Sequence, residues 1–172
     1  MVKALLKAAG WRPAAIVLLT VSVLAGLFFR HPLAVSSRPF ACRVIGISDG
    51  DTFACLKEGE DKTFVRLFGI DAPERRQPYG KKAKQYLSGQ IHGKTVSVVS
   101  HGQDRYGRTL GTVFLGRTNI NLKMVRSGYA WVYREYTDDA ELIGAEEAAK
   151  SVKAGLWADP HPINPADYRK QF

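Results

Sequence analysis

The stretch Arg43–Leu56, RVIGISDGDTFACL, is the part of the chain from which the fold is predicted. Apolar and β-branched residues stand on both sides of the turn residues Ser48–Asp51, a pattern that predicts two strands joined by a tight turn. A second polar turn, Glu58–Asp61, leads to a third strand over Thr63–Phe68. We therefore expect three consecutive strands at the start of the folded domain.

The rest of the chain alternates helical and extended patterns. The elements expected after the third strand are a helix over 79–91, strands over 94–100 and 109–115, a short helix that Asn119 or Asn121 caps and Gly128 ends, and a longer helix from about 138 to 153. The proline-rich end from Asp159 to Pro165 is expected to be extended. This order predicts an α+β domain with a small antiparallel sheet. Five such strands can close into a Greek-key barrel, but the pattern alone leaves closure open.

Length, charge and cysteine count limit the classes of protein to which this sequence can belong. The 172 residues suit one domain of ordinary size, and Lys and Arg outnumber Asp and Glu by 25 to 16. The net charge is +9, and four of the cations lie in the first 30 residues, which contain no acid. The excess of 21 basic over 16 acidic residues in the remainder suits an anionic partner such as nucleic acid or a phospholipid surface. Two cysteines exclude a disulfide-dense scaffold and a four-cysteine zinc site.

Residues 1–36 are predicted to form a signal or anchor helix. Lys3, Lys7 and Arg12 precede an uncharged, largely apolar run over 13–29, the pattern of a secretory signal. Small residues at 34–36 permit cleavage, whereas the long apolar run equally suits an uncleaved anchor in the cytoplasmic membrane. In either case we expect a domain over 37–160 and a tail over 161–172 to be exported, periplasmic or extracellular.

Three polar clusters lie at the ends of expected strands. They are Asp49-Gly50-Asp51-Thr52, then Arg66 followed by Asp71-Ala72-Pro73-Glu74, and finally Asp104-Arg105-Tyr106-Gly107-Arg108. Read singly, the first is a hairpin turn, the second a loop entry and the third a basic connection. Their combination in the loops of one small basic sheet indicates a common site.

The chemistry that this set suits is phosphodiester hydrolysis. Two carboxylates offer hard oxygen ligands to a cation such as calcium or magnesium. A third carboxylate can orient or deprotonate water, and two guanidiniums can pair with phosphate oxygens and stabilise the charge of the transition state. The four histidines lie far apart in the sequence, so no histidine cluster competes with this interpretation.

The clusters, in their order and spacing, resemble the staphylococcal nuclease (thermonuclease) family from about residue 43 to residue 157. The segments Gly128–Tyr133 and Gly155–Trp157 are similar to the late strand and closing helix of that family. The resemblance implies a five-stranded, OB-fold-like antiparallel barrel with about three helices. It also implies a calcium-dependent nuclease that acts on DNA and RNA, which we expect to be a monomer.

The resemblance further implies roles for individual residues. Asp51 and Asp71 would be the metal carboxylates, with the backbone carbonyl of Ala72 as a further ligand and Asp49 just outside them. Glu74 would be the general base, and Arg66 and Arg108 would hold the scissile phosphate. The residues that would contact the neighbouring phosphate or base are Arg105, Tyr106 and Tyr136. The best-known member of the family has threonine where this chain has Ala72, so a hydroxyl contact is absent here.

A second interpretation remains open beside catalysis. A non-catalytic OB module would bind single strands through basic and aromatic residues. Such a module would be expected to lose a metal acid, the base or an arginine. All five of these positions are filled here, which favours the nuclease.

Cys42 and Cys55 are expected to form a disulfide. Export would place the domain where disulfides persist. If Asp49–Asp51 turns a hairpin, the two cysteines lie within about a step of direct opposition, and a bulge at Gly46 would bring them into register. The alternative is two small buried thiols.

Overall fold

The structure, a computed structural model, describes residues 38–59 and 62–171. The strands are β1 (Phe40–Ile47), β2 (Thr52–Lys57), β3 (Lys62–Leu67), β4 (Ile70–Asp71), β5 (Thr95–Gln103), β6 (Thr109–Leu115), β7 (Thr118–Asn119) and β8 (Trp131–Val132). The helices are α1 (Gly80–Ile91), α2 (Ile120–Arg126), α3 (Ala140–Ser151), the 3-10 helix η1 (Gly155–Ala158) and α4 (Pro165–Arg169). The expected signal or anchor segment lies outside the described residues. Within the residues that are described, no helix has the length and apolar character needed to cross a bilayer.

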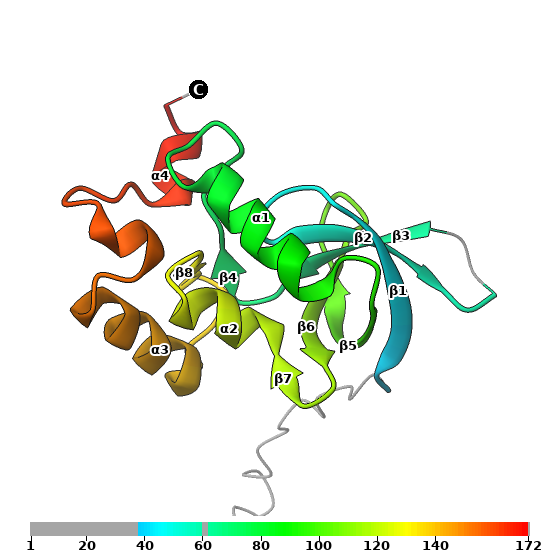
Figure 1. Cartoon of the computed structure of the whole chain (residues 1–172). Coiled ribbons are helices and arrows are strands. Elements are labelled where there is room, and N and C mark those ends of the chain that lie inside the picture. Colours follow the sequence, from blue (N-terminus) through cyan, green and yellow to red (C-terminus); the bar gives the residue numbers. More distant parts are fainter. Residues whose placement is uncertain (1–37, 60–61, 172) are drawn as a thin grey trace, which may run out of the picture. The chain divides into compact units, whose positions relative to one another are not determined.

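Five strands form a closed barrel. Neighbouring strands follow the order β3-β2-β1-β5-β6, and β3 also pairs with β6, which closes the sheet on itself (Figure 1). The expected OB-fold-like α+β barrel is therefore confirmed. The closing pair runs parallel, with Val65 opposite Thr109 and Leu67 opposite Gly111, whereas the other neighbours in the barrel run antiparallel.

Alternating strand residues and one helical face build the core. Val44, Val65 and Val98 point inward from three different strands and are almost fully buried. Helix α1 buries Ala83, Leu87 and Ile91, which recur every four residues and therefore share one face. The apolar periodicity predicted this helix correctly, within one residue of its observed start.

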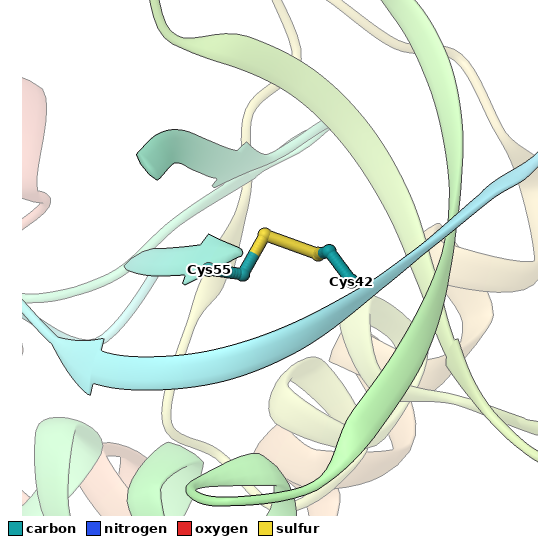
Figure 2. Close-up of a disulfide and its surroundings, with 2 residues drawn as sticks. All are labelled: Cys42 and Cys55. Carbon is teal, nitrogen blue, oxygen red and sulfur yellow. A yellow bond between two sulfur atoms is a disulfide. The ribbon is translucent and has the colours of Figure 1, made fainter. Parts of the chain in front are cut away.

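Cys42 and Cys55 are joined by a disulfide across the β1–β2 hairpin (Figure 2). Their α-carbons are 5.6 Å apart, within the range that a disulfide accepts. The pairing register differs from the expectation, because Cys42 lies opposite Lys57 while Cys55 lies opposite Val44. The bulge between Val44 and Gly46 is on the turn side of the cysteines and does not align them. Both side chains point into the barrel, so the bond forms between diagonal neighbours.

The C-terminal segment folds back onto the loop that follows β4. The amide Nε2 of Gln77 donates a 2.6 Å hydrogen bond to the carbonyl of Ile163. Asn164 then caps α4 by accepting a hydrogen bond from the backbone N–H of Ala166. The extended conformation expected near the C-terminus is observed only as far as residue 164, and the remainder is helical.

Glu146 is a buried carboxylate that joins α3 to β8. Its Oε1 accepts a 2.8 Å hydrogen bond from the Val132 N–H, and its Oε2 accepts hydrogen bonds from Arg134 and Lys150. Burial alone would raise the pKa of this group, but these hydrogen bonds and the Lys150 charge outweigh it and hold the pKa below its ordinary value.

Candidate active site

The β1–β2 turn places Asp49 and Asp51 at the end of the barrel. The Asp49 carboxylate accepts a 3.1 Å hydrogen bond from the Asp51 N–H, which is a turn that Asp favours. A β-carbon at Gly50 would lie 2.6 Å from that of Ala72 and 2.8 Å from that of Ala83. Only glycine therefore lets this turn pack directly against α1 and the segment after β4.

Arg66, on β3, links the two acids that were expected to bind metal. Its Nη1 donates a 2.6 Å hydrogen bond to Asp51, and its Nη2 donates one of 2.8 Å to Asp71. Both carboxylates are 2% exposed. The other oxygen of Asp51 accepts a hydrogen bond from the Ala72 N–H at 2.9 Å. One guanidinium thus holds the two buried acids side by side.

The charge of this buried cluster is only partly neutralised. Burial raises the pKa of Asp51 to about 7; Arg66 opposes that rise, while the neighbouring charges of Asp49 and Asp71 add to it. Burial alone would lower the pKa of Arg66, but the charges of Asp51 and Asp71 raise it, so Arg66 remains cationic. The cluster therefore favours an additional positive charge, which Arg169 supplies through hydrogen bonds to both oxygens of Asp71.

Glu74 lies on the loop between β4 and α1, held by backbone contacts. Its N–H donates a 2.9 Å hydrogen bond to Oε1 of the Gln77 side chain, which is buried. A β-carbon at Gly80 would collide with the Glu74 carbonyl, so α1 starts in direct contact with this loop. The Glu74 side chain itself is 38% exposed, which leaves its carboxylate accessible.

Arg108 is oriented by Asp104 across the β5–β6 loop. Asp104 accepts a 2.7 Å hydrogen bond from Arg108 Nε, and its other carboxylate oxygen accepts the backbone N–H groups of Tyr106 and Arg108. Burial would raise the pKa of Asp104, but these hydrogen bonds lower it overall. The exposed ring of Tyr106 lies beneath the guanidiniums of Arg105 and Arg108, at 4.9 and 5.4 Å from its centre.

These loops meet around one groove with a volume of about 730 Å³. The predicted site residues that line it are Asp49, Arg66, Glu74, Arg105, Tyr106, Arg108 and Tyr136. Asp51, Asp71 and Ala72 are buried and do not line the groove; Arg66, which does, contacts both acids directly. The structure thus brings the three sequence clusters together.

Sequence reasoning missed three residues of the site. Tyr133 lines the groove beside Tyr136, with ring centres 4.7 Å apart. Arg169 also lines it, and Gln77 supports the loop beneath Glu74. Tyr133 could have been found from the tyrosines that follow Trp131, but no local pattern connects Arg169 to acids 95 or more residues away.

The donor set is compatible with a hard divalent cation. Among residues 38–59 and 62–171, no group of three or more His, Cys, Asp or Glu side chains is arranged to hold a metal ion. Asp51 and Asp71 nonetheless provide adjacent buried carboxylates, which Arg66 bridges. Cations such as magnesium are commonly held by one or two carboxylates together with water and substrate phosphates. The residues present therefore fit such a cation, provided that water or substrate completes its coordination.

The basic OB-type barrel and its groove of carboxylates and arginines are those that the resemblance to nucleases implies. The model of the family described as "Staphylococcal nuclease homologue" matches residues 64–159. That span covers more than half of the sequence. The chain belongs to the staphylococcal nuclease family.

Individual relatives agree with this assignment. A Haemophilus influenzae protein named "Uncharacterized endonuclease" is 45% identical over 145 residues, which cover 84% of this chain and 82% of the relative. A Shigella flexneri protein named "Micrococcal nuclease" is 39% identical over 168 residues, or 91% of this chain and 90% of the relative. An Escherichia coli protein named "Protein ParB" is 40% identical over 139 residues, or 74% and 78%. The match to these relatives thus extends over most of each chain.

Proposed function

We propose that this nuclease hydrolyses phosphodiester bonds of both DNA and RNA with the help of one calcium ion. The observation that carries the proposal is the groove, which places Arg66, Glu74 and Arg108 around one space directly above the buried Asp51–Asp71 pair. A binding module would need the basic and aromatic residues of this groove. Binding alone would not require the accessible carboxylate of Glu74, whose backbone is held by the buried amide of Gln77.

Glu74 acts as the general base. Its carboxylate faces the groove and is accessible to solvent, so a water molecule can reach it. The hydrogen bond to Gln77 fixes the backbone of Glu74, which limits the positions of its carboxylate. A positioned carboxylate that takes a proton from attacking water contributes typically about 100- to 10,000-fold to a rate.

Arg66 and Arg108 bind the phosphate. Both guanidiniums line the groove, and each is already oriented by a carboxylate, Arg66 by Asp51 and Asp71 and Arg108 by Asp104. Prior orientation means that little has to reorganise when charge develops on the phosphate oxygens during attack. Planar guanidiniums also make paired hydrogen bonds to phosphate.

Asp51 and Asp71 would hold the calcium ion, with the backbone carbonyl of Ala72 as a further ligand. The bound ion would supply Lewis-acid polarisation of a phosphate oxygen. Asp49 adds negative charge beside Asp51, and its carboxylate accepts a hydrogen bond from the Asp51 backbone N–H. Arg105, Tyr106 and Tyr136 would contact the adjoining nucleotide, because they line the same groove and present one cationic and two aromatic side chains.

We also propose that the domain acts outside the cytoplasm, in the periplasm or beyond it, either released or anchored by residues 13–29. Two observations support this location. The basic and apolar pattern at the N-terminus is that of an export signal, and a disulfide such as Cys42–Cys55 persists in oxidising compartments. Recovery of the protein from the cytoplasmic fraction, with free thiols, would contradict this location.

The proposed reaction is tested by product analysis with the full-length protein. Labelled single-stranded DNA and RNA are incubated with excess chelator, with added calcium, and with the Glu74→Gln variant plus calcium. We expect cleavage of both substrates only with calcium, and turnover reduced by about 100-fold or more in Glu74→Gln. Glu147→Gln, an exposed glutamate on α3, is the matched control. Undiminished cleavage in chelator would refute the calcium requirement, and normal turnover of Glu74→Gln would refute its role as base.

A further inference from the structure

Arg169, the last residue of α4, reaches into the groove and contacts two of the acids there. Its Nη2 donates a 2.9 Å hydrogen bond to Oδ2 of Asp71, and its Nη1 donates one of 3.1 Å to Oδ1. The same Nη1 donates a 2.8 Å hydrogen bond to Oε1 of Glu74. A residue three positions from the end of the sequence is therefore part of the site.

This contact involves the carboxylates that the proposed mechanism needs. Arg169 hydrogen-bonds to both oxygens of Asp71, and Oδ1 also accepts a hydrogen bond from Arg66. A divalent cation on Asp71 would have to share these oxygens with a guanidinium. A cation on Asp71 would lie close to the Arg169 guanidinium, and two positive charges so near each other repel strongly in a partly buried site. Arg169 and the cation therefore compete for Asp71.

The balance of charge also indicates that Arg169 and a cation would compete for Asp71. Around Asp51 and Asp71 the acids are Asp49, Asp51, Asp71 and Glu74, and the guanidiniums bonded to members of this set are those of Arg66 and Arg169. Asp104, which also lines the groove, is paired with Arg108. The acids outnumber the guanidiniums, so Arg169 supplies part of the positive charge that the cluster requires. It does so at the position where a cation ligand and the general base meet.

We propose that Arg169 replaces the divalent cation in the cation-free enzyme, so that α4 is an autoinhibitory latch that moves away from Asp71 and Glu74 when the cation binds. The inference rests on the proposed function only in taking Asp71 as a cation ligand and Glu74 as the base. While the latch is closed, the base is neutralised and the cation site is blocked. The enzyme is thus inactive until a cation opens it.

The attachment of α4 allows this movement. The segment before the helix is held by the hydrogen bond from Gln77 to the Ile163 carbonyl, and Pro165 at the first turn is buried. Arg169 lies at the other end of this five-residue helix, and its side chain is 38% exposed. Displacement of the last turn therefore leaves the barrel and its core intact.

A different interpretation is that Arg169 binds the substrate phosphate, as a third arginine beside Arg66 and Arg108. The contacts favour the latch, because every hydrogen bond recorded for the Arg169 guanidinium goes to Asp71 or Glu74. The two interpretations predict different results when calcium binds. A latch that competes with the cation gives tighter binding when Arg169 is replaced and releases α4 when calcium binds. A phosphate ligand that stays in place gives no calcium-dependent release of α4.

The two interpretations of Arg169 are distinguished by calcium binding. Binding is measured on full-length proteins by titration calorimetry, without nucleic acid. We compare the wild type with Arg169→Gln and with Lys170→Gln. Lys170 is the neighbouring residue and pairs with Asp167 at 2.8 Å, so its replacement removes the same charge without the loss of a hydrogen bond to Asp71 or Glu74. If the latch is closed in about 90% of molecules, opening it tightens the apparent dissociation constant about tenfold. We expect that gain for Arg169→Gln and a change of less than about twofold for Lys170→Gln.

A second measurement follows the latch in the wild type. Amide hydrogen exchange across residues 166–171 should become faster when calcium is added at saturating concentration, since the last turn of α4 is released. Equal calcium affinity for wild type and Arg169→Gln would overturn the latch and leave the proposed nuclease mechanism standing. Calcium-independent exchange of α4 at saturation would also overturn it. Failure of both proteins to bind calcium would overturn the latch and the calcium requirement together.

Discussion

The side chain of Gln77 accepts a 2.9 Å hydrogen bond from the backbone N–H of Glu74, three residues before it. The other end of the same amide donates to the Ile163 carbonyl at 2.6 Å. Gln77 is only 5% exposed, so neither bond is easily replaced by water. A buried amide therefore determines where the backbone of the expected base lies, and couples that backbone to the C-terminal segment.

Replacing Gln77 with alanine should lower kcat by about tenfold and change KM little, because Glu74 loses the support of its backbone while the arginines of the groove remain. Steady-state kinetics on the folded variant measure both values. Gln90→Ala, near the far end of α1, is the control. A rise in KM with unchanged kcat would show that Gln77 supports substrate binding instead.

The two arginines should differ in their effect on stability. Arg66→Ala leaves two buried carboxylates without their shared partner, which should cost about 3 kcal/mol or more of the free energy of unfolding. Arg108→Ala breaks a more exposed pair with Asp104 and should cost about 1 kcal/mol. Both variants should lose about 100-fold or more in kcat/KM. Denaturant unfolding and kinetics test this together, and equal destabilisation by the two changes would contradict the assignment.

The stability contributed by Glu146 should depend on pH. Its pKa is lowered in the folded state from an ordinary value of 4.5, so the folded protein favours the ionised form. The resulting stability is fully present above pH 4.5 and is lost as the pH falls through the lowered pKa. Glu146→Gln should cost about 2 kcal/mol at pH 6, and the difference from wild type should shrink toward pH 3. The exposed Glu147→Gln variant should show little effect at either pH.

The disulfide should contribute modestly to stability. The ring closed by Cys42 and Cys55 is short, so replacing both with serine should cost about 3 kcal/mol at most. Thermal unfolding of the double variant against wild type measures this. Alkylation of unreduced, unfolded wild type should label no cysteine, and two labelled thiols in exported protein would show that the bond does not form.

Local patterns predicted most of the barrel and the three polar clusters that meet at the candidate site. The strands, α1 and α3 could be found because alternation and four-residue spacing reflect which side chains face the core. The acids and arginines could be found because they lie in compact clusters at strand ends. The parallel β3–β6 pair could not be predicted from local patterns, because it joins residues 44 positions apart in the sequence with no turn between them. Arg169 was missed for the same reason.

That parallel pair has a consequence for the order in which the protein gains its function. The pairing register places Arg66 opposite Leu110, two residues after Arg108, so the two arginines of the groove come together only when the barrel closes. Contacts between distant parts of a chain carry a large entropic cost and tend to form late in folding. A newly made chain that has not completed its last pairing therefore lacks the assembled groove. We expect it to have no nuclease activity until folding ends.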